Sequence, residues 1–170
     1  MKGKILLVIP VALLALSIIP AKAAPTWYNK AEMEITGFTF MGPDPGGRGL
    51  LFDVTFVGVA AGPNIKEATV EGVDHLLMDW EGIGHLDVYL TDTDKQGEKI
   101  SAHITGLAVT KTPGRIVFEN AQATVINTAG YPTTGKYTDL IGTTFNVEGF
   151  ITELSINPPS GYIHAKWCWT

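Results

Sequence analysis

Residues 72–106 read GVDHLLMDWEGIGHLDVYLTDTDKQGEKISAHITG and contain the clearest strand–turn–strand pattern in the chain. Apolar and polar residues alternate on both sides of Asp94-Lys-Gln-Gly97, which has the Asp-x-x-Gly pattern of a type I turn closing a hairpin. Successive side chains of a strand point to opposite faces of the sheet. The stretch therefore predicts two antiparallel strands, each with one apolar and one polar face.

The polar face of this hairpin gathers titratable side chains. On the two strands it carries, in order, His85, Asp87, Tyr89 and Thr91, then Lys99, Ser101, His103 and Thr105. A three-residue loop with a glycine bulge would pair Tyr89 with His103, whereas a five-residue loop would pair Asp87 with His103. In either register, Asp87 and His103 are direct or diagonal neighbours on one face.

The rest of the chain reads as short β segments separated by Gly and Pro. Strands are expected at 31–41, 50–60, 65–71, 74–80, 115–128, 145–156 and 162–169, and residues 107–110 continue the second strand of the hairpin. One helical turn is the alternative for 65–71. A switch of alternation at Thr36-Gly37 predicts a β-bulge in the first of them. No segment after residue 23 keeps a helical period over ten residues. We therefore expect an all-β sandwich or antiparallel β-barrel in one domain, 24–170, with little or no helix.

Residues 1–23 have the features of a secretory signal peptide. Lys2 and Lys4 precede an apolar run, and Ala21-Lys-Ala23 is a small-residue cleavage pattern. The run of about 15 apolar residues is short for a membrane-spanning helix, which needs about 20. We expect the mature domain to be exported, either secreted or periplasmic, with no membrane association after cleavage.

Charge and cysteine content narrow the function classes. Loss of residues 1–23 would remove three lysines and no acidic residue, which takes the formal charge from −5 to −8. Nucleic-acid binding needs clustered Lys and Arg, so no nucleic-acid partner is expected. Cys168 is the only cysteine, so the core must hold the domain together without an internal disulfide.

The meaning of the polar cluster depends on which face of the hairpin lines the barrel. If the apolar face fills the interior, His85, Asp87 and His103 form an ordinary hydrophilic exterior. If the polar face points inward, His103 and Asp87 become an acid/base pair, because a carboxylate beside an imidazole raises its pKa and fixes its tautomer. Asp74, which precedes an apolar run, would then be an orienting carboxylate at the mouth of a pocket.

Further candidates for ligand contact lie near this cluster. They are His75, Trp80, His85, Tyr89 and Ser101. Two histidines and a carboxylate could in principle bind a metal, but no closely spaced ligand motif such as His-x-His occurs. No metal and no cofactor are therefore expected.

Several motifs resemble, in their order, those of the DUF3237 (UPF0311) family. They are Gly62-Pro-Asn-Ile-Lys-Glu-Ala68, Glu71-Gly-Val-Asp-His75, Gly84-His-Leu-Asp-Val-Tyr89 and Asp94-Lys-Gln-Gly-Glu-Lys-Ile100, followed by Gly106. The resemblance implies a small antiparallel β-barrel similar to calycin and allene-oxide-cyclase-like barrels. It would place recurring family aspartates at Asp74 and Asp87, and it supplies no catalytic role. Val73 and Tyr89 depart from the Gly and Arg usual in the family.

Three functions follow as expectations. The first is an exported β-barrel that binds a small, largely apolar molecule in its lumen, since apolar pockets with a few polar groups are the usual form of such sites. The second is an isomerase- or cyclase-type enzyme that uses the His–Asp pair. The third is a fully packed barrel acting as a structural or interaction domain. A homo-oligomer would cover exposed Phe and Trp side chains.

Overall fold

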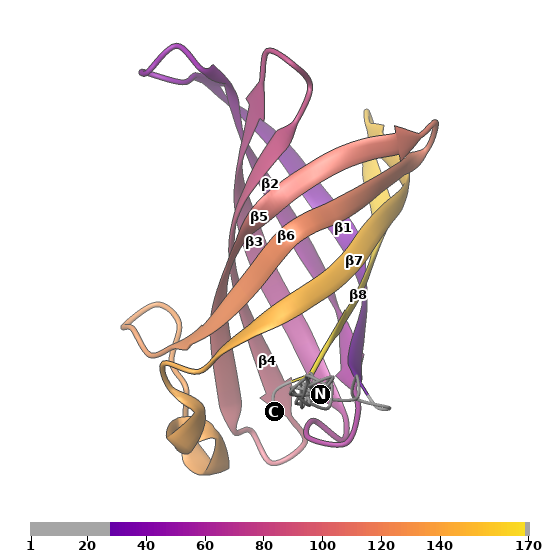
Figure 1. Ribbon diagram of the computed structural model, residues 1–170. Helices are drawn as coiled ribbons and strands as arrows, with labels where there is room; N and C mark the ends of the chain where they lie inside the picture. Colours follow the sequence, from indigo (N-terminus) through magenta and orange to yellow (C-terminus); the bar gives the residue numbers. More distant parts are fainter. Residues whose placement is uncertain (1–27, 169–170) are drawn as a thin grey trace, which may run out of the picture.

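The computed structural model describes residues 28–168, which form a closed barrel of eight antiparallel strands (Figure 1). The strands are β1 (Asn29–Pro43), β2 (Gly49–Ala61), β3 (Ala68–Asp79), β4 (Gly84–Asp94), β5 (Lys99–Thr112), β6 (Arg115–Ile126), β7 (Thr144–Ile156) and β8 (Pro159–Trp167). A six-residue 3₁₀ helix, η1 (Gly135–Leu140), lies between β6 and β7. The predicted all-β, antiparallel β-barrel is confirmed.

Each strand pairs with its neighbour in the chain, and the barrel closes where β1 pairs with β8. Asn29 lies opposite Trp167 in this last pairing, and Glu34 lies opposite Tyr162. Closure leaves no exposed sheet edge, so the backbone donors and acceptors of the first and last strands are satisfied internally.

The hairpin of β4 and β5 has the register of the three-residue loop. Tyr89 pairs with His103 and Asp87 with Thr105, so the alternative five-residue loop is wrong. The turn has the chemistry that its sequence predicts. Asp94 Oδ1 accepts hydrogen bonds from the backbone N–H groups of Gln96 (2.9 Å) and Glu98 (3.0 Å). Gly97 has φ +81°, a conformation that a residue with a Cβ rarely adopts.

Other expected strands match the structure with two differences. The predicted bulge is present, because the β1–β2 register shifts between Ile35 and Gly37. The separate strand expected at 65–71 is wrong: 62–67 is a loop, and β3 runs without a break through the expected strand at 74–80. Ile65 is buried in that loop, so its apolar character reflects burial rather than strand structure. The connection between β6 and β7 contains the 3₁₀ helix η1, an element that the expected strands did not include.

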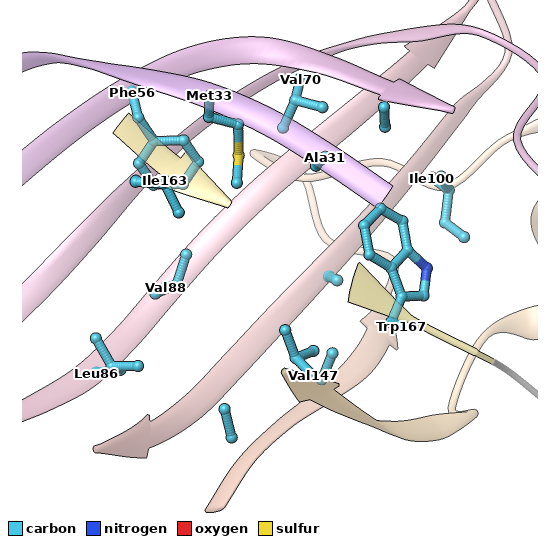
Figure 2. Close-up of a cluster of buried hydrophobic side chains, with 14 of the residues drawn as sticks. Ala31, Met33, Phe56, Val70, Leu86, Val88, Ile100, Val147, Ile163 and Trp167 are labelled. Atoms are coloured by element: carbon cyan, nitrogen blue, oxygen red, sulfur yellow. The ribbon is translucent and has the colours of Figure 1, made fainter. Parts of the chain in front are cut away.

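The apolar face of the hairpin points into the barrel. Leu86 and Val88 of β4 and Ile100 and Ala102 of β5 are buried in the core cluster with side chains from the other strands. Figure 2 shows side chains of β1, β2, β3, β4, β5, β7 and β8 converging on the same interior, with Trp167 at one end. The polar face of β4 and β5 therefore forms part of the outer surface.

The two ends of the barrel differ. At the end where β1 begins and β8 finishes, Ile65, Tyr137 of η1 and Trp167 are all buried, and they close the interior. The opposite end carries the β1–β2 hairpin, the upper left part of Figure 1. Five of the apolar side chains there are exposed: Phe40, Met41, Trp80, Leu154 and Ile156. We call these the closed end and the open end.

The expected signal peptide, residues 1–23, lies outside the described residues. Within 28–168 there is no helix long and apolar enough to cross a membrane.

Candidate functional site

A cavity of about 260 Å³ occupies the barrel lumen. Its wall is almost entirely apolar. Near the closed end it includes Ala31, Val70, Ile100, Val147 and Trp167, and near the open end it includes Phe38, Phe52, Met78, Ile116, Phe118, Leu154 and Ile156. Because Leu154 and Ile156 also face solvent, the lumen is continuous with the outside at the open end. This combination of apolar wall and open mouth is typical of small-molecule sites.

Three polar side chains line this cavity: Asp74, Asp92 and Thr110. No Lys, Arg or His side chain of the described residues belongs to the wall. The lumen is thus an apolar space with two carboxyl groups and no cation to balance them. These two carboxyl groups are the chemically distinctive feature of the interior.

Asp92 lies deep in the lumen. It is 4 % exposed, and its Cα lies opposite Val70 of β3 and Ile100 of β5. Among residues 28–168, no side chain or backbone group hydrogen-bonds or ion-pairs with its carboxyl group. Burial alone raises the pKa of Asp92 to about 7, because a carboxylate loses its hydration in an apolar environment.

Asp74 has a partner. The β3–β4 ladder is interrupted between the Asp74–Val88 and Leu77–His85 pairs, and the backbone N–H of Asp87 donates to Asp74 Oδ1 at 2.9 Å. Burial raises the pKa of Asp74 to about 6, against the lowering effect of that hydrogen bond. Asp74 therefore stabilises the strand pairing as well as facing the cavity. It lies in the wall of the lumen, not at the mouth where the sequence placed it.

The two carboxyl groups are too far apart to work as a pair. Asp74 lies opposite Val88, and Asp92 is four residues further along β4. At about 3.3 Å per residue this places them on the order of 13 Å apart along the strand direction. Two carboxyl groups that share a proton must nearly touch, so each acts alone.

Asp87 and His103 do meet, but on the outside of the barrel. His103 Nε2 lies 2.6 Å from Asp87 Oδ1, and the two side chains are 31 % and 49 % exposed. Tyr89 stacks on His103 with ring centroids 4.5 Å apart. The interpretation in which this face points inward is wrong, because Leu86, Val88 and Leu90 occupy the inner face instead. The pair has no access to a molecule in the lumen.

The remaining histidines of the central stretch form similar outer pairs. His75 Nδ1 lies 2.7 Å from Asp53 Oδ1, and His85 Nε2 lies 3.0 Å from Asp79 Oδ2. Trp80 is exposed in the turn after β3, where its Nε1 donates to the carbonyl of Gly47 at 2.8 Å. None of the three expected ligand contacts, His75, His85 and Trp80, belongs to the cavity wall.

Ser101 is on the outer face as well, yet it is fully buried. The loop after β6 covers it: Ser101 Oγ donates to the carbonyl of Pro132 at 2.8 Å, and its N–H donates to Thr133 Oγ1 at 3.0 Å. Thr91 Oγ1 lies 2.8 Å from Ser101 Oγ. The same loop brings Tyr131 against Tyr89. Ser101 and Tyr89 therefore fix this loop rather than contact the lumen.

No group of three or more His, Cys, Asp or Glu side chains within 28–168 is arranged to hold a metal ion. The histidine–carboxylate pairs on β2 to β5 each contain one imidazole and one carboxylate, which is too few ligands for a typical protein metal site.

Sequence reasoning missed Asp92, although a signal was present. Leu86, Val88, Leu90 and Asp92 alternate along β4, so Asp92 continues the apolar face. A charged residue that continues a row of buried apolar residues is either hydrated at the end of the strand or buried because it has a functional role. The closed end buries it here, since loop 62–67 and η1 lie beyond it.

Comparisons with known proteins identify the fold and no function. No family model matches the sequence, and no curated protein matches it significantly. Several solved structures share the barrel at low identity, among them the following three. A conserved protein of unknown function from Rhodopseudomonas palustris has a TM-score of 0.59 and 15 % identity, covering 85 % of this chain and 99 % of its own. A protein of unknown function from Clostridium acetobutylicum has a TM-score of 0.57 and 11 % identity, covering 84 % and 97 %.

The third structure is described as a β-barrel-like protein from Acinetobacter baumannii, with a TM-score of 0.57 and 11 % identity, covering 87 % of this chain and all of its own. Each solved chain matches over nearly its whole length, so the barrel is a complete unit in these proteins. At such low identities the similarity concerns the fold alone.

Proposed function

We propose that this protein is an exported barrel that binds a small, largely apolar molecule in its lumen. The observation that carries the proposal is the apolar cavity of about 260 Å³, open at one end and closed at the other. The apolar run before Ala21-Lys-Ala23 supports export. An enzyme that uses Asp87 and His103 is not favoured, because that pair lies on the outer face.

The cavity volume bounds the size of the ligand. Since a water molecule takes up about 30 Å³ of liquid, this volume suits a molecule on the order of ten non-hydrogen atoms. A linear eight-carbon alcohol, 1-octanol, is therefore a suitable probe for the apolar part of the site. Isothermal titration calorimetry of the purified protein with 1-octanol measures its binding directly.

A matched pair of variants locates the binding site. Ala102→Leu adds three carbons to the lumen wall, whereas Thr105→Leu adds apolar volume on the outer face of the same strand, β5. At about 0.8 kcal/mol per buried methylene, loss of room for three carbons weakens binding roughly tenfold to a hundredfold. Thr105→Leu leaves the affinity unchanged. Equal affinity in Ala102→Leu and the wild type would contradict the proposal.

A further inference from the structure

Asp92 is a polar group buried without a partner at the inner end of the cavity. Its neighbours in the sheet are Val70 and Ile100, and within the described residues nothing donates a hydrogen bond to its carboxyl group. Buried carboxyl groups in proteins are normally paired or hydrogen-bonded, because isolation in an apolar environment is unfavourable by several kcal/mol. The carboxyl group faces the cavity, so a molecule in the lumen is able to supply the missing partner.

The charges around the lumen indicate the chemistry of that partner. A ligand with a carboxylate would face Asp92 and Asp74 with no Lys, Arg or His in the wall to compensate. A pure hydrocarbon would leave Asp92 unpaired. An alcohol would supply one neutral hydrogen bond, whereas an ammonium group supplies both a hydrogen bond and the opposite charge. Charge-assisted hydrogen bonds are about twice as strong as neutral ones.

We infer that Asp92 anchors the inner end of the lumen ligand, and that the ligand is an apolar molecule ending in a protonated amine. This inference rests on the proposed function and specifies its ligand class. The amine would lie at the closed end and the apolar part would extend toward Phe38, Phe52 and Phe118 at the open end. Asp74 is the weaker anchor because its Oδ1 already accepts the N–H of Asp87.

Other charged groups near Asp92 already have partners. Asp94, at the closed end of β4, forms ion pairs and hydrogen bonds with Lys136 and Tyr137 of η1, and Lys136 also pairs with Glu98. None of these groups appears in the cavity wall, and the shift in the pKa of Asp92 arises from burial alone. An amine that binds Asp92 therefore replaces its proton and not an existing ion pair.

Three probes with the same chain test the inference: octylamine, 1-octanol and octanoate. Each is titrated calorimetrically into the wild type, Asp92→Asn and Asp74→Asn. Asp139→Asn is the control, because it removes an exposed carboxylate of η1 outside the lumen. Titrations in two buffers of different ionisation enthalpy count the protons released on binding.

Octylamine is expected to bind the wild type with an affinity at least about tenfold higher than that of 1-octanol. Octanoate is expected to bind more weakly than either. At about pH 6, where Asp92 is mostly protonated, octylamine binding releases close to one proton, and at about pH 8.5 close to none. Asp92→Asn abolishes both the preference for the amine and the proton release. Asp139→Asn retains both in full. Asp74→Asn, which removes the weaker anchor, lowers the preference for the amine by less than Asp92→Asn does.

Each other outcome overturns a defined part of the reasoning. If 1-octanol binds as tightly as octylamine, or if Asp92→Asn keeps the preference, the anchor is wrong while lumen binding stands. If Asp74→Asn alone removes the preference, the anchor is Asp74. If Asp139→Asn reduces the preference for octylamine as much as Asp92→Asn does, the preference arises from the negative charge of the protein surface in general. If no probe binds, the proposed function itself fails.

Discussion

Replacement of Asp92 with Asn is expected to stabilise the folded protein above about pH 7 and to change its stability little below about pH 4. The pKa of Asp92 rises from 3.8 to about 7 on folding because the side chain is buried. The folded state therefore binds a proton more tightly than the unfolded state. Its stability is complete below the unfolded pKa and falls as the pH rises through the folded pKa. Asn has a similar shape and carries no ionisable group.

The size of the effect follows from the two pKa values. Each pKa unit of difference corresponds to about 1.4 kcal/mol, so the difference between 3.8 and about 7 corresponds to about 4 kcal/mol. Water that enters the open lumen reduces this penalty, and we expect about 2–4 kcal/mol. Domains of this size are stable by about 5–15 kcal/mol in total. Ionisation of one buried side chain thus removes a large share of the stability.

Urea unfolding between about pH 4 and pH 8 measures this effect. Tryptophan fluorescence and circular dichroism follow unfolding of the wild type, Asp92→Asn and the surface control Asp139→Asn. Asp74, whose pKa is also raised by burial, is present in all three proteins, so its contribution cancels in the differences between them. The free energy of unfolding of Asp92→Asn should exceed that of the wild type increasingly from about pH 4 to pH 7 and then level off.

Two results would refute the reasoning. A difference between Asp92→Asn and the wild type that stays constant over the whole pH range would mean that the Asp92 carboxyl group is hydrated in the folded protein. An Asn variant that is less stable at every pH would mean that the carboxylate has a stabilising partner. In either case the side chain would not be the unpaired anchor of the lumen.

Two further substitutions test the packing around the barrel. Gly72→Ala should destabilise the protein by about 1–3 kcal/mol, because the added Cβ would lie 2.5 Å from Cζ of Phe56 and 2.8 Å from the carbonyl oxygen of Tyr89. Equal urea midpoints for the variant and the wild type would show that the neighbouring side chains and backbone move to accommodate the Cβ without loss of stability. Ser101→Ala should lower stability by about 1–3 kcal/mol, since Thr91 Oγ1 and the Pro132 carbonyl lose a buried partner. Hydrogen exchange should increase in the covering loop 127–134, and unchanged protection there would contradict this role.

Local features of the sequence predicted the strands and the central hairpin. The period of two identified β4 and β5, and the Asp-x-x-Gly turn limited their register to two choices, of which Tyr89 opposite His103 is the observed one. The bulge near Gly37 was also predicted, since it follows from a local change of alternation. The contact between Asp87 and His103 was predicted for the same reason: neighbouring strands of a hairpin bring their own side chains together.

The candidate site itself could not be predicted in the same way. A strand with one apolar and one polar face is compatible with a packed interior or with a ligand cavity lined by the polar face. The choice depends on how all eight strands close and on the total volume of the inner side chains. The sequence therefore offered His103, Asp87 and Ser101, which lie outside the cavity wall, and Asp74, which lies in it, but it did not offer Asp92.

The sequence by itself determined the class of the fold, most strand boundaries to within a few residues and two possible registers for the central hairpin, because these depend on period and turn chemistry over short distances. Tertiary structure alone decided that β1 closes on β8, that the histidines face outward and that Asp92 lies near the closed end without a partner among residues 28–168. Burial is a property of everything that surrounds a side chain. Asp92 lies near the closed end of the barrel, where side chains of loop 62–67, η1 and β8 are buried together, and no local pattern records that arrangement.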